Sequence, residues 1–493
     1  MSRGAFQELD AISLLTPHTK LAIRPPGLEV IPNVIQNAYR TSWYGRPGTG
    51  FVDLPADIIQ GIVEDAAEVQ DIFPVPEGPK GAAEEAKLFK IAQMLKSAKA
   101  PLVVIGKGAA YAQAERAITD MINRTHLPFL PTPMGKGVLP DSHSSNTASA
   151  RSTALKEADI VLILGARLNW ILHFGDAPKW NPNAQFIQID ISAEELGRNR
   201  PSAGSVSLLG DLATIVPQIT AALGSWHYPP NTPYTQHVHA STQKNLATAA
   251  TKAASTAHPM TYSRALSTIE QTLHSLSPVD DGGIVYISEG ANTMDISRSI
   301  FPVSHPRLRL DAGTHATMGV GLGYAIAAHA AYNGPAPEAR SGPPGRKKIV
   351  CLEGDSAFGF SAMEVETMAR YNMDVLIFVL NNGGVYHGDS DSADHWLALQ
   401  AATASGKPTG GLRSTSLGWE VGYEKIAEMC GGVGVLVRTP EELERAAREG
   451  FQSGEVFVVN VIIEAGKGAK LEFGWQASGK KGGRKSRGGE AKL

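Results

Sequence analysis

The sequence predicts an α/β protein that is built from parallel sheets with helices on their faces. Short apolar runs alternate with helix-period segments between about residues 83 and 465, which is the pattern of successive βαβ units. Several of these runs end in Gly-rich polar turns, where parallel sheets commonly bind ligands. With 493 residues and 43% hydrophobic content, the chain can form two to four domains, each with a core.

The first segment, residues 1–70, is too small to form a core by itself. It contains one apolar run at residues 51–54 and two helical patterns. One strand and two helices cannot bury enough apolar surface, so we expect this segment to be the last part of a larger domain. Residues 71–82, rich in Pro and Gly, predict a linker.

The second segment, residues 83–225, predicts a sheet of Rossmann type. Apolar runs at 102–105, 161–164 and 186–191 are separated by helical patterns, which indicates parallel strands. The polar stretch 226–258 that follows is expected to be a second linker.

The third segment, residues 259–465, predicts another sheet of parallel strands. Residues 332–346 lack periodicity and predict a surface insertion. The expected strands are residues 284–287, 349–352, 375–380 and 456–463.

Two of these strands carry polar side chains at their carboxyl ends. Asp355 follows the run 349–352 in a Gly-rich turn, and Asn382 follows the run 375–380. Because a βαβ unit places both carboxyl ends at one edge of the sheet, we expect the two side chains to lie side by side. A carboxylate, an amide oxygen and a nearby carbonyl suit Mg²⁺. The alternative is an ordinary βαβ unit with a polar turn after each strand.

Charge and cysteine content exclude several classes of protein. A net charge of −3 argues against a general nucleic-acid binder. Cys351 and Cys430, the only cysteines, do not form a metal-ligand pair by spacing, and their use fits a reducing compartment. The sequence has no apolar run of membrane-spanning length and no N-terminal signal core.

The segment from Glu353 to Gly388 resembles the metal and diphosphate motif of thiamine-diphosphate enzymes, G-D-(G/S/A) followed by N-N. Other blocks, in the same order, narrow the resemblance to the 2-hydroxyacyl-CoA lyase family, with oxalyl-CoA decarboxylase as its near relative. The similarity extends from about residue 4 to about residue 464. The blocks are residues 4–8 (GAFQE), 45–48 (GRPG), 105–111 (IGKGAAY), 130–137 (LPTPMGKG), 165–175 (GARLNWILHFG), 289–295 (EGANTMD) and 317–321 (TMGVG).

The resemblance implies a thiamine-diphosphate-binding fold. Residues 1–70 would be a C-terminal remnant of the pyrimidine-binding domain, 83–225 a Rossmann-like central domain, and 259–465 the domain that binds the diphosphate and Mg²⁺. The implied reaction cleaves a 2-hydroxyacyl-CoA into formyl-CoA and an aldehyde one carbon shorter, as in fatty acid alpha-oxidation. Thiamine diphosphate and Mg²⁺ would lie between two subunits of a homodimer or homotetramer. The alternatives are oxalyl-CoA decarboxylase and a non-catalytic truncated product.

The same resemblance assigns the cofactor residues. Asp355, Asn382 and the carbonyl of Gly384 would hold Mg²⁺. Gly354 and Ser356 would flank the diphosphate, and Asn292 would lie near the cofactor. Met318 matches the bulky residue that supports the bent cofactor, although it could equally be a core methionine.

Three further residues have a functional and a structural interpretation. Tyr386 lies at the mouth of the site, where its hydroxyl could donate to a developing oxyanion, or it could pack. Gln7 could contact substrate in the partner's active site, or it could fray with the terminus. Arg298 could contact the CoA thioester or lie on a solvated helix face.

The turns of the central domain have a weaker signal for a nucleotide. Gly106-Lys107-Gly108, Arg167 and Asp190 follow three expected strands, where Rossmann-like sheets bind nucleotides. The resemblance to the decarboxylase raises ADP as a ligand. G-K-G is not the full dinucleotide fingerprint, so we favour a structural domain.

The two ends of the chain give the remaining expectations. The family uses a glutamate upstream of the GAFQE block to activate the cofactor, and no residue of this sequence matches it. We therefore expect a truncated form or a misplaced start, inactive alone. Residues 466–493 carry eight Lys or Arg against two Glu, which predicts a disordered basic tail. It ends in Ala491-Lys492-Leu493, close to the peroxisomal address S-K-L that an import receptor reads.

Overall fold

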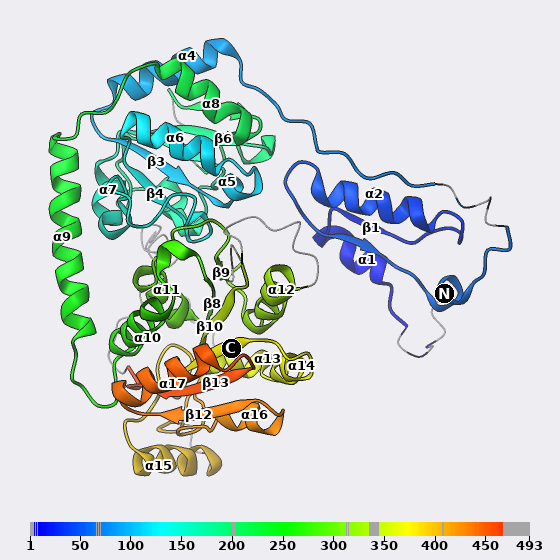
Figure 1. Ribbon diagram of the computed structural model, residues 1–493, viewed down its shortest axis with the longest axis vertical. Helices are drawn as coiled ribbons and strands as arrows, with labels where there is room; N and C mark the ends of the chain where they lie inside the picture. The colour runs from blue at the N-terminus through cyan, green and yellow to red at the C-terminus, as the bar shows by residue number, and fades with distance from the viewer. Residues whose placement is uncertain are drawn as a thin grey trace, which may run out of the picture.

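Three parts follow one another along the chain, and each contains a parallel sheet (Figure 1). The computed structural model describes residues 4, 6, 8–65, 67, 69, 71–199, 204–311, 313, 315–334, 345–406 and 409–466. Gln7, the tail from 467 onward and most of the expected insertion at 332–346 lie outside the described residues. Within the described part, no helix is both long and apolar enough to cross a membrane.

The N-terminal part is a two-stranded parallel sheet with three helices. Strand β1 (Leu21–Ile23) pairs with β2 (Gly50–Val52), in the register Leu21 opposite Gly50. The helices are α1 (Ala11–Leu15), α2 (Ile31–Trp43) and α3 (Ala56–Gln60).

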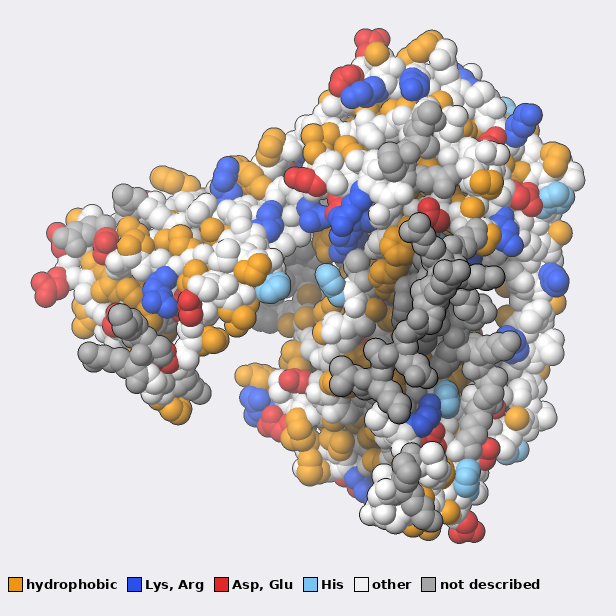
Figure 2. All heavy atoms as spheres, turned by 180° about the vertical axis from the view of Figure 1, so that it is seen from behind, with side chains coloured by type: hydrophobic (Ala, Val, Ile, Leu, Met, Phe, Trp, Pro, Cys, Tyr) orange, Lys and Arg blue, Asp and Glu red, His pale blue; other side chains and the backbone are white. Residues whose placement is uncertain are grey.

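This part has almost no interior. Of its described residues, only Pro25 and Ala38 are buried. Figure 2 shows hydrophobic side chains gathered on its surface, at the left of that view. The exposed large ones are Phe6, Leu9, Leu14, Ile35, Tyr39, Trp43, Ile59 and Ile62. The expectation that these residues cannot form a core alone is thus met in the structure, because two strands and three helices bury too little.

The central part is a five-stranded parallel sheet in the order β4-β3-β5-β6-β7. Every residue of the central strands β3 and β5 is buried, because helices cover both faces of the sheet. The three expected strands are present, whereas short β4 and β7 were not predicted. The elements are α4 (Glu85–Ser97), β3 (Pro101–Ile105), α5 (Lys107–Tyr111), α6 (Glu115–Thr125), β4 (Phe129–Pro131), α7 (Arg151–Glu157), β5 (Ile160–Leu164), β6 (Gln185–Asp190), β7 (Val206–Leu209) and α8 (Leu212–Leu223).

The expected linker at residues 226–258 is largely a helix instead, α9 (Pro233–Ala253). It runs along one side of the molecule from the central part to the C-terminal part (Figure 1). Thr232 and Thr235 form a capping box, and a Pro occupies the first turn. Only Tyr234 and Val238 are buried, so the sequence lacks the apolar stripe that would have predicted a helix.

The C-terminal part is a six-stranded parallel sheet in the order β12-β13-β11-β10-β8-β9. Strands alternate their side chains between two cores, one under α10, α11 and α17 and the other under α12, α13, α14 and α16. The strands are β8 (Ile284–Glu289), β9 (Arg309–Asp311), β10 (Lys348–Gly354), β11 (Val375–Asn381), β12 (Val433–Val437) and β13 (Phe457–Ile462). The helices are α10 (Tyr262–Leu276), α11 (Ala291–Ile300), α12 (Gly321–Asn333), α13 (Asp355–Ser361), α14 (Glu364–Arg370), α15 (Ala393–Ala404), α16 (Glu424–Met429) and α17 (Pro440–Gln452).

Polar contacts join the central and C-terminal parts. Asp141 and Val303 exchange two hydrogen bonds, from the Asp141 N–H to the Val303 carbonyl and from the Val303 N–H to Asp141 Oδ2, each 3.0 Å. Lys136 Nζ donates to the Arg298 carbonyl at 2.9 Å, and Arg307 Nη1 pairs with Glu115 at 2.6 Å. These contacts fix one sheet relative to the other.

Candidate active site

Asp355 is the centre of the polar edge of the C-terminal sheet. It begins α13 directly after β10, and the neighbouring strand β11 delivers Asn382 beside it. Asp355 Oδ2 accepts hydrogen bonds from the N–H groups of Asn382, Gly383 and Gly384 at 3.2, 2.8 and 3.2 Å. The sequence prediction that Asp355 and Asn382 lie together is met.

The Asp355 carboxylate is buried without a cation. Its residue is 2% exposed, and no Lys, Arg or His of the described chain pairs with it. Burial raises its pKa to about 7, although the hydrogen bonds from four backbone N–H groups act in the other direction. A bound divalent ion would supply the missing positive charge and favour the carboxylate. The oxygen donors of Asp355 and Asn382, with the Gly384 carbonyl adjacent, are the type that Mg²⁺ prefers.

The loop after β11 is held around the carbonyl of Tyr386. Asn292 Nδ2 donates to this oxygen at 2.7 Å and Asn382 Nδ2 at 3.2 Å. Tyr386 has φ +67°, a left-handed conformation that is unfavourable for a side chain of this size. Burial raises the pKa of Tyr386 further above neutral pH, so its hydroxyl is protonated there. Asn292 and Tyr386, distant in sequence, are therefore both parts of this edge.

Gly290 and Gly354 lie where the turns after β8 and β10 meet, so no side chain covers the backbone there. Gly290, at φ +90°, separates β8 from α11, and a Cβ there would lie 3.0 Å from the Gly354 nitrogen. Gly354 precedes α13, and the Ser356 N–H donates to Asp355 Oδ1 at 2.7 Å. Main chain at such turns can approach a diphosphate closely.

Met318 lies in the loop that leads into α12, half-buried, beside Gly319. The carboxylate of Glu289 accepts the N–H groups of Gly319 and Gly321 and so fixes this loop to the end of β8. The role of Met318 as a support for a bent cofactor remains a prediction.

Glu353 is a feature that sequence reasoning missed. It lies on β10 opposite Glu289 of β8 and is fully buried. Within the part of the chain that the structure describes, neither of its carboxylate oxygens has a hydrogen-bond partner. Burial, and then the proximity of Glu289, raise the pKa of Glu353 well above its usual range. The signal was available in the sequence, because both glutamates stand at the ends of expected strands just before a glycine.

Arg298 lies on α11 in an ion-pair network. Its Nη1 contacts Asp295 at 2.6 Å and its Nε contacts Asp311 at 3.0 Å, with only 16% of the side chain exposed. The interpretation as a solvated helix residue does not describe it. A substrate contact remains a prediction, for which Nη2 is the donor without a protein partner in the described chain.

A large cavity of about 1190 Å³ separates the N-terminal part from the central part. The three turns predicted from the sequence converge on it, through Gly106, Lys107, Arg167 and Asp190. Arg46 and Lys20 face it from the N-terminal part. Burial, and then the nearby Arg167 and Arg46, lower the pKa of Lys107. Carboxylates line the cavity as well, and Glu195 pairs with both Arg46 and Arg167, at 2.5 and 3.6 Å.

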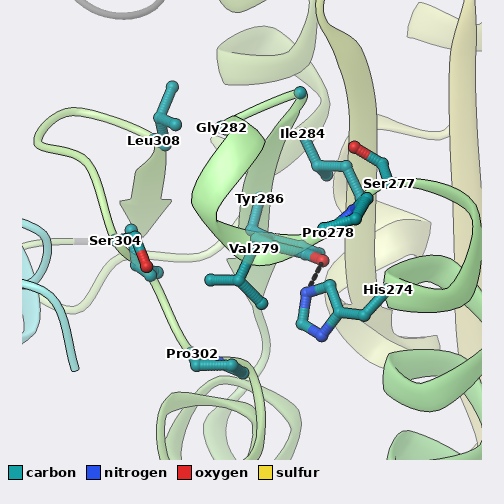
Figure 3. A pocket seen from close by; sticks show the side chains of 12 residues that line it. His274, Ser277, Pro278, Val279, Gly282, Ile284, Tyr286, Pro302, Ser304 and Leu308 are labelled. Atoms are coloured by element: carbon teal, nitrogen blue, oxygen red, sulfur yellow. Dashed lines mark hydrogen bonds between the residues drawn. The ribbon is translucent and has the colours of Figure 1, made fainter. Parts of the chain in front are cut away.

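A second cavity of about 20 Å³ lies at the opposite edge of the C-terminal sheet, near the start of β8 (Figure 3). Tyr286 and His274 point toward one another there, with 2.8 Å between the hydroxyl and Nε2, and His274 Nδ1 lies 2.8 Å from Glu270. Such a volume holds about one water. It is far too small for a cofactor.

Comparisons with known proteins identify the parts that carry this geometry. Residues 88–219 match the thiamine pyrophosphate enzyme central domain, and residues 289–461 match the C-terminal thiamine pyrophosphate binding domain. The chain is 41% identical over 477 residues to human 2-hydroxyacyl-CoA lyase 1, covering 96% of this chain and 78% of the relative. The chain belongs to the 2-hydroxyacyl-CoA lyase family of thiamine-pyrophosphate enzymes.

Two further relatives define the range of this family. The 2-hydroxyacyl-CoA lyase of Saccharomyces cerevisiae is 38% identical over 496 residues, covering 96% of this chain and 80% of the relative. Oxalyl-CoA decarboxylase of Escherichia coli K12 is 35% identical over 472 residues, covering 95% and 78%. Both identities to lyases exceed that to the decarboxylase, and the C-terminal match makes thiamine diphosphate the cofactor of this chain.

Proposed function

We propose that this protein is a carbon–carbon lyase that uses thiamine diphosphate and Mg²⁺ to cleave 2-hydroxyacyl-CoA into formyl-CoA and an aldehyde one carbon shorter. The observation that carries the proposal is the buried Asp355 carboxylate without a cation, at the edge that matches a thiamine pyrophosphate binding domain. Asp355, Asn382 and Gly384 would hold Mg²⁺. Asn292, Met318, Gly354 and Ser356 would surround the cofactor.

The proposed reaction breaks the C1–C2 bond of the acyl group. Thiamine diphosphate, when bound, supplies an electron sink for the electron pair that this bond leaves on C1. The hydroxyl on C2 loses its proton as that carbon becomes the aldehyde, and C1 gains a proton to become the formyl group. Tyr386 keeps its phenolic proton and can donate to an oxyanion at the site mouth. Gln7 remains a predicted polar contact, outside the described residues.

The cavity between the N-terminal and central parts is suited to the nucleotide end of CoA. Lys20 and Lys107 offer positive charge to phosphates, Arg46 would share its charge with Glu195, and three strand-end turns offer backbone N–H groups. Arg298 would contact the thioester end. ADP is the alternative occupant of the same cavity.

The co-product separates the lyase from the decarboxylase. Both reactions release formyl-CoA, but the lyase also releases an aldehyde, whereas oxalyl-CoA decarboxylase releases carbon dioxide. The purified chain, with Mg²⁺ and thiamine diphosphate, is to be given each thioester in turn. Any preparation that turns over should release aldehyde from a 2-hydroxyacyl-CoA. Carbon dioxide from oxalyl-CoA with no aldehyde would support the decarboxylase, and no turnover with bound cofactor would support a non-catalytic product.

Replacing the central carboxylate tests the metal site directly. Asp355→Ala should abolish Mg²⁺-dependent binding of thiamine diphosphate in calorimetry, because the buried carboxylate beside Asn382 is lost. Asp394→Ala, on the exposed first turn of α15, is the control and should bind like the unaltered chain. Unchanged affinity in Asp355→Ala would show that other groups hold the metal.

We further propose a peroxisomal location and a homo-oligomer. The location rests on Ala491-Lys492-Leu493, and an import receptor would be the partner. The oligomer rests on two exposed apolar side chains that a second subunit would cover. They are Phe360, which a Cβ at Gly319 would meet at 3.2 Å, and Met363 at the start of α14.

The terminal tripeptide can be tested apart from the enzyme. A fluorescent protein that ends in residues 466–493 should form puncta that coincide with a peroxisomal marker. The same fusion without the last three residues is the control and should be diffuse. Diffuse signal from both fusions would refute the targeting assignment.

A further inference from the structure

The loop that carries Tyr386 lies against residues 413–417, a segment without an assigned role. Gly384 and Ser416 form an antiparallel bridge. The Val385 N–H donates to the Thr415 carbonyl at 2.9 Å, and the Leu417 N–H donates to the Gly383 carbonyl at 3.1 Å. Backbone of residues 415–417 is therefore hydrogen-bonded to the turn at residues 383–385, which contains the proposed metal ligand Gly384.

All three nitrogens of the Arg413 guanidinium bond to this loop, and we call these three interactions the grip of Arg413. Nη2 donates to the His387 carbonyl at 2.8 Å and Nη1 to His387 Nε2 at 3.0 Å, while Nε pairs with Asp389 Oδ1. A guanidinium only donates, so Nε2 of His387 is the acceptor. His387 Nδ1 therefore carries the proton and donates to the Gly388 carbonyl at 3.0 Å.

Asp389 orients the Arg413 side chain in turn. It is 11% exposed at its side chain and accepts from the Arg413 backbone N–H at 3.1 Å and from the Ser416 hydroxyl. Arg413 is 38% exposed, so its charge is screened by water and the pair contributes little by attraction alone. Its effect is geometric, because a rigid fork fixes the ring and the carbonyl of one residue together.

The residue next to this grip is Tyr386, in its left-handed conformation at φ +67°. From the inner side, Asn292 and Asn382 hold its carbonyl. From the outer side, Arg413 holds His387. A left-handed tyrosine reverts readily to an extended conformation unless both neighbours are fixed.

We propose that Arg413, oriented by Asp389, is a positioning residue that keeps the Tyr386 hydroxyl directed at the reacting group. The inference rests on the proposed function for the role of Tyr386. The grip itself does not, because it is a property of the protein without substrate. Arg413 touches neither substrate nor cofactor in this account and acts through the loop 384–389.

Hydrogen–deuterium exchange of the full chain tests the grip without any need for turnover. Arg413→Met should raise the exchange rate of the 384–389 amides at least severalfold, and Arg413→Lys should give a smaller increase because one ammonium cannot replace the fork. Arg438→Met is the matched control, since Arg438 also makes a two-pronged ion pair, with Glu420 at 2.7 and 2.6 Å, and is 49% exposed. Unchanged exchange in Arg413→Met, or an equal increase in Arg438→Met, would overturn the proposal.

Turnover of the holoenzyme tests the connection to Tyr386. Arg413→Met should lower kcat by about ten- to a hundredfold, as a small misplacement does, while the Kd for thiamine diphosphate with Mg²⁺ stays within about twofold. In a Tyr386→Phe background the same replacement should have little further effect, because the positioned hydroxyl is already absent. Independent, multiplying effects of the two replacements would overturn the connection. A chain without turnover whose 384–389 amides still respond would contradict the proposed function and leave the grip supported.

Discussion

Gly321 lies where the ends of two neighbouring strands bring their glutamates together. A Cβ on Gly321 would be 2.2 Å from Glu353 Oε1 and 2.6 Å from Glu289 Oε2, so both carboxyl groups reach toward this one residue. Neither has a cation beside it in the described chain. Two buried carboxyl groups in this arrangement avoid repulsion by keeping at least one proton, which is the direction of the raised pKa of Glu353.

A methyl group at Gly321 should therefore displace the carboxyl groups of Glu289 and Glu353. We expect Gly321→Ala to lower the free energy of unfolding by about 1–3 kcal/mol, the usual cost of overpacking. The change would also displace the Gly319 loop that Glu289 holds. Chemical denaturation measures the loss.

Gly323 provides the control for this prediction. It lies two residues further along the same helix, and a Cβ there would meet nothing within 4 Å. Gly323→Ala should be neutral or stabilise by up to about 1 kcal/mol, because alanine is the better helix former. Equal destabilisation by both replacements would contradict the packing argument.

The start of helix α17 and the face that it buries both follow from its local sequence. The Glu442 side chain accepts from the N–H groups of Arg438 and Thr439 at 2.8 and 3.2 Å, and the Thr439 hydroxyl accepts from the Glu442 N–H. This capping box fixes the first turn. The helix then buries Leu443, Ala446, Ala447 and Gly450 against the core of the C-terminal sheet.

Removing the Thr439 hydroxyl should destabilise the first turn of α17. Thr439→Ala is expected to cost about 0.5–2 kcal/mol of stability, because the Glu442 N–H loses its partner. Thr439→Ser keeps the hydroxyl and should cost much less. Denaturation midpoints of the two variants make the comparison, and equal midpoints would show that packing alone holds the helix.

At the scale of the whole molecule, Asp141 is the contact that most firmly joins the central and C-terminal sheets. Its side chain accepts from both Lys136 and the Val303 N–H. Lys136 is almost enclosed, and burial lowers its pKa. Removing the acid would leave this ammonium without its counter-charge.

Asp141→Ala should destabilise the protein by about 3–5 kcal/mol, the range for breaking one half of a buried ion pair. We expect calorimetry to show the C-terminal and central parts unfolding in separate transitions. Asp120→Ala is the control, because the Asp120–Arg124 pair is exposed and i,i+4 on one helix. A single unshifted transition in Asp141→Ala would mean that α9 and apolar contacts suffice to join the parts.

The sequence alone determined the family, the parallel sheets and the meeting of Asp355 with Asn382 at one edge of a sheet. Strand period and Gly-rich turns are local signals, and the strand–helix–strand connection has a fixed hand, so Asp355 and Asn382 had to meet. Asn292, Met318 and Tyr386 came from the resemblance, whereas the hydrogen bond from Asn292 to the Tyr386 carbonyl did not. The helix α9 was missed because its stability comes from caps and alanine rather than from an apolar stripe.

Only the tertiary structure decided which side chains lack partners and which loops support one another. Asp355 is buried without a cation, and the Glu353 carboxylate is buried without a hydrogen-bond partner in the described part of the chain. Both facts depend on what packs over these side chains, which no local pattern records. The grip of Arg413 on the Tyr386 loop joins residues whose spacing carries no periodic signal. The enclosure of Lys136 depends on how the central and C-terminal sheets meet. Contacts between these two parts set that arrangement, and along the chain α9 lies between them.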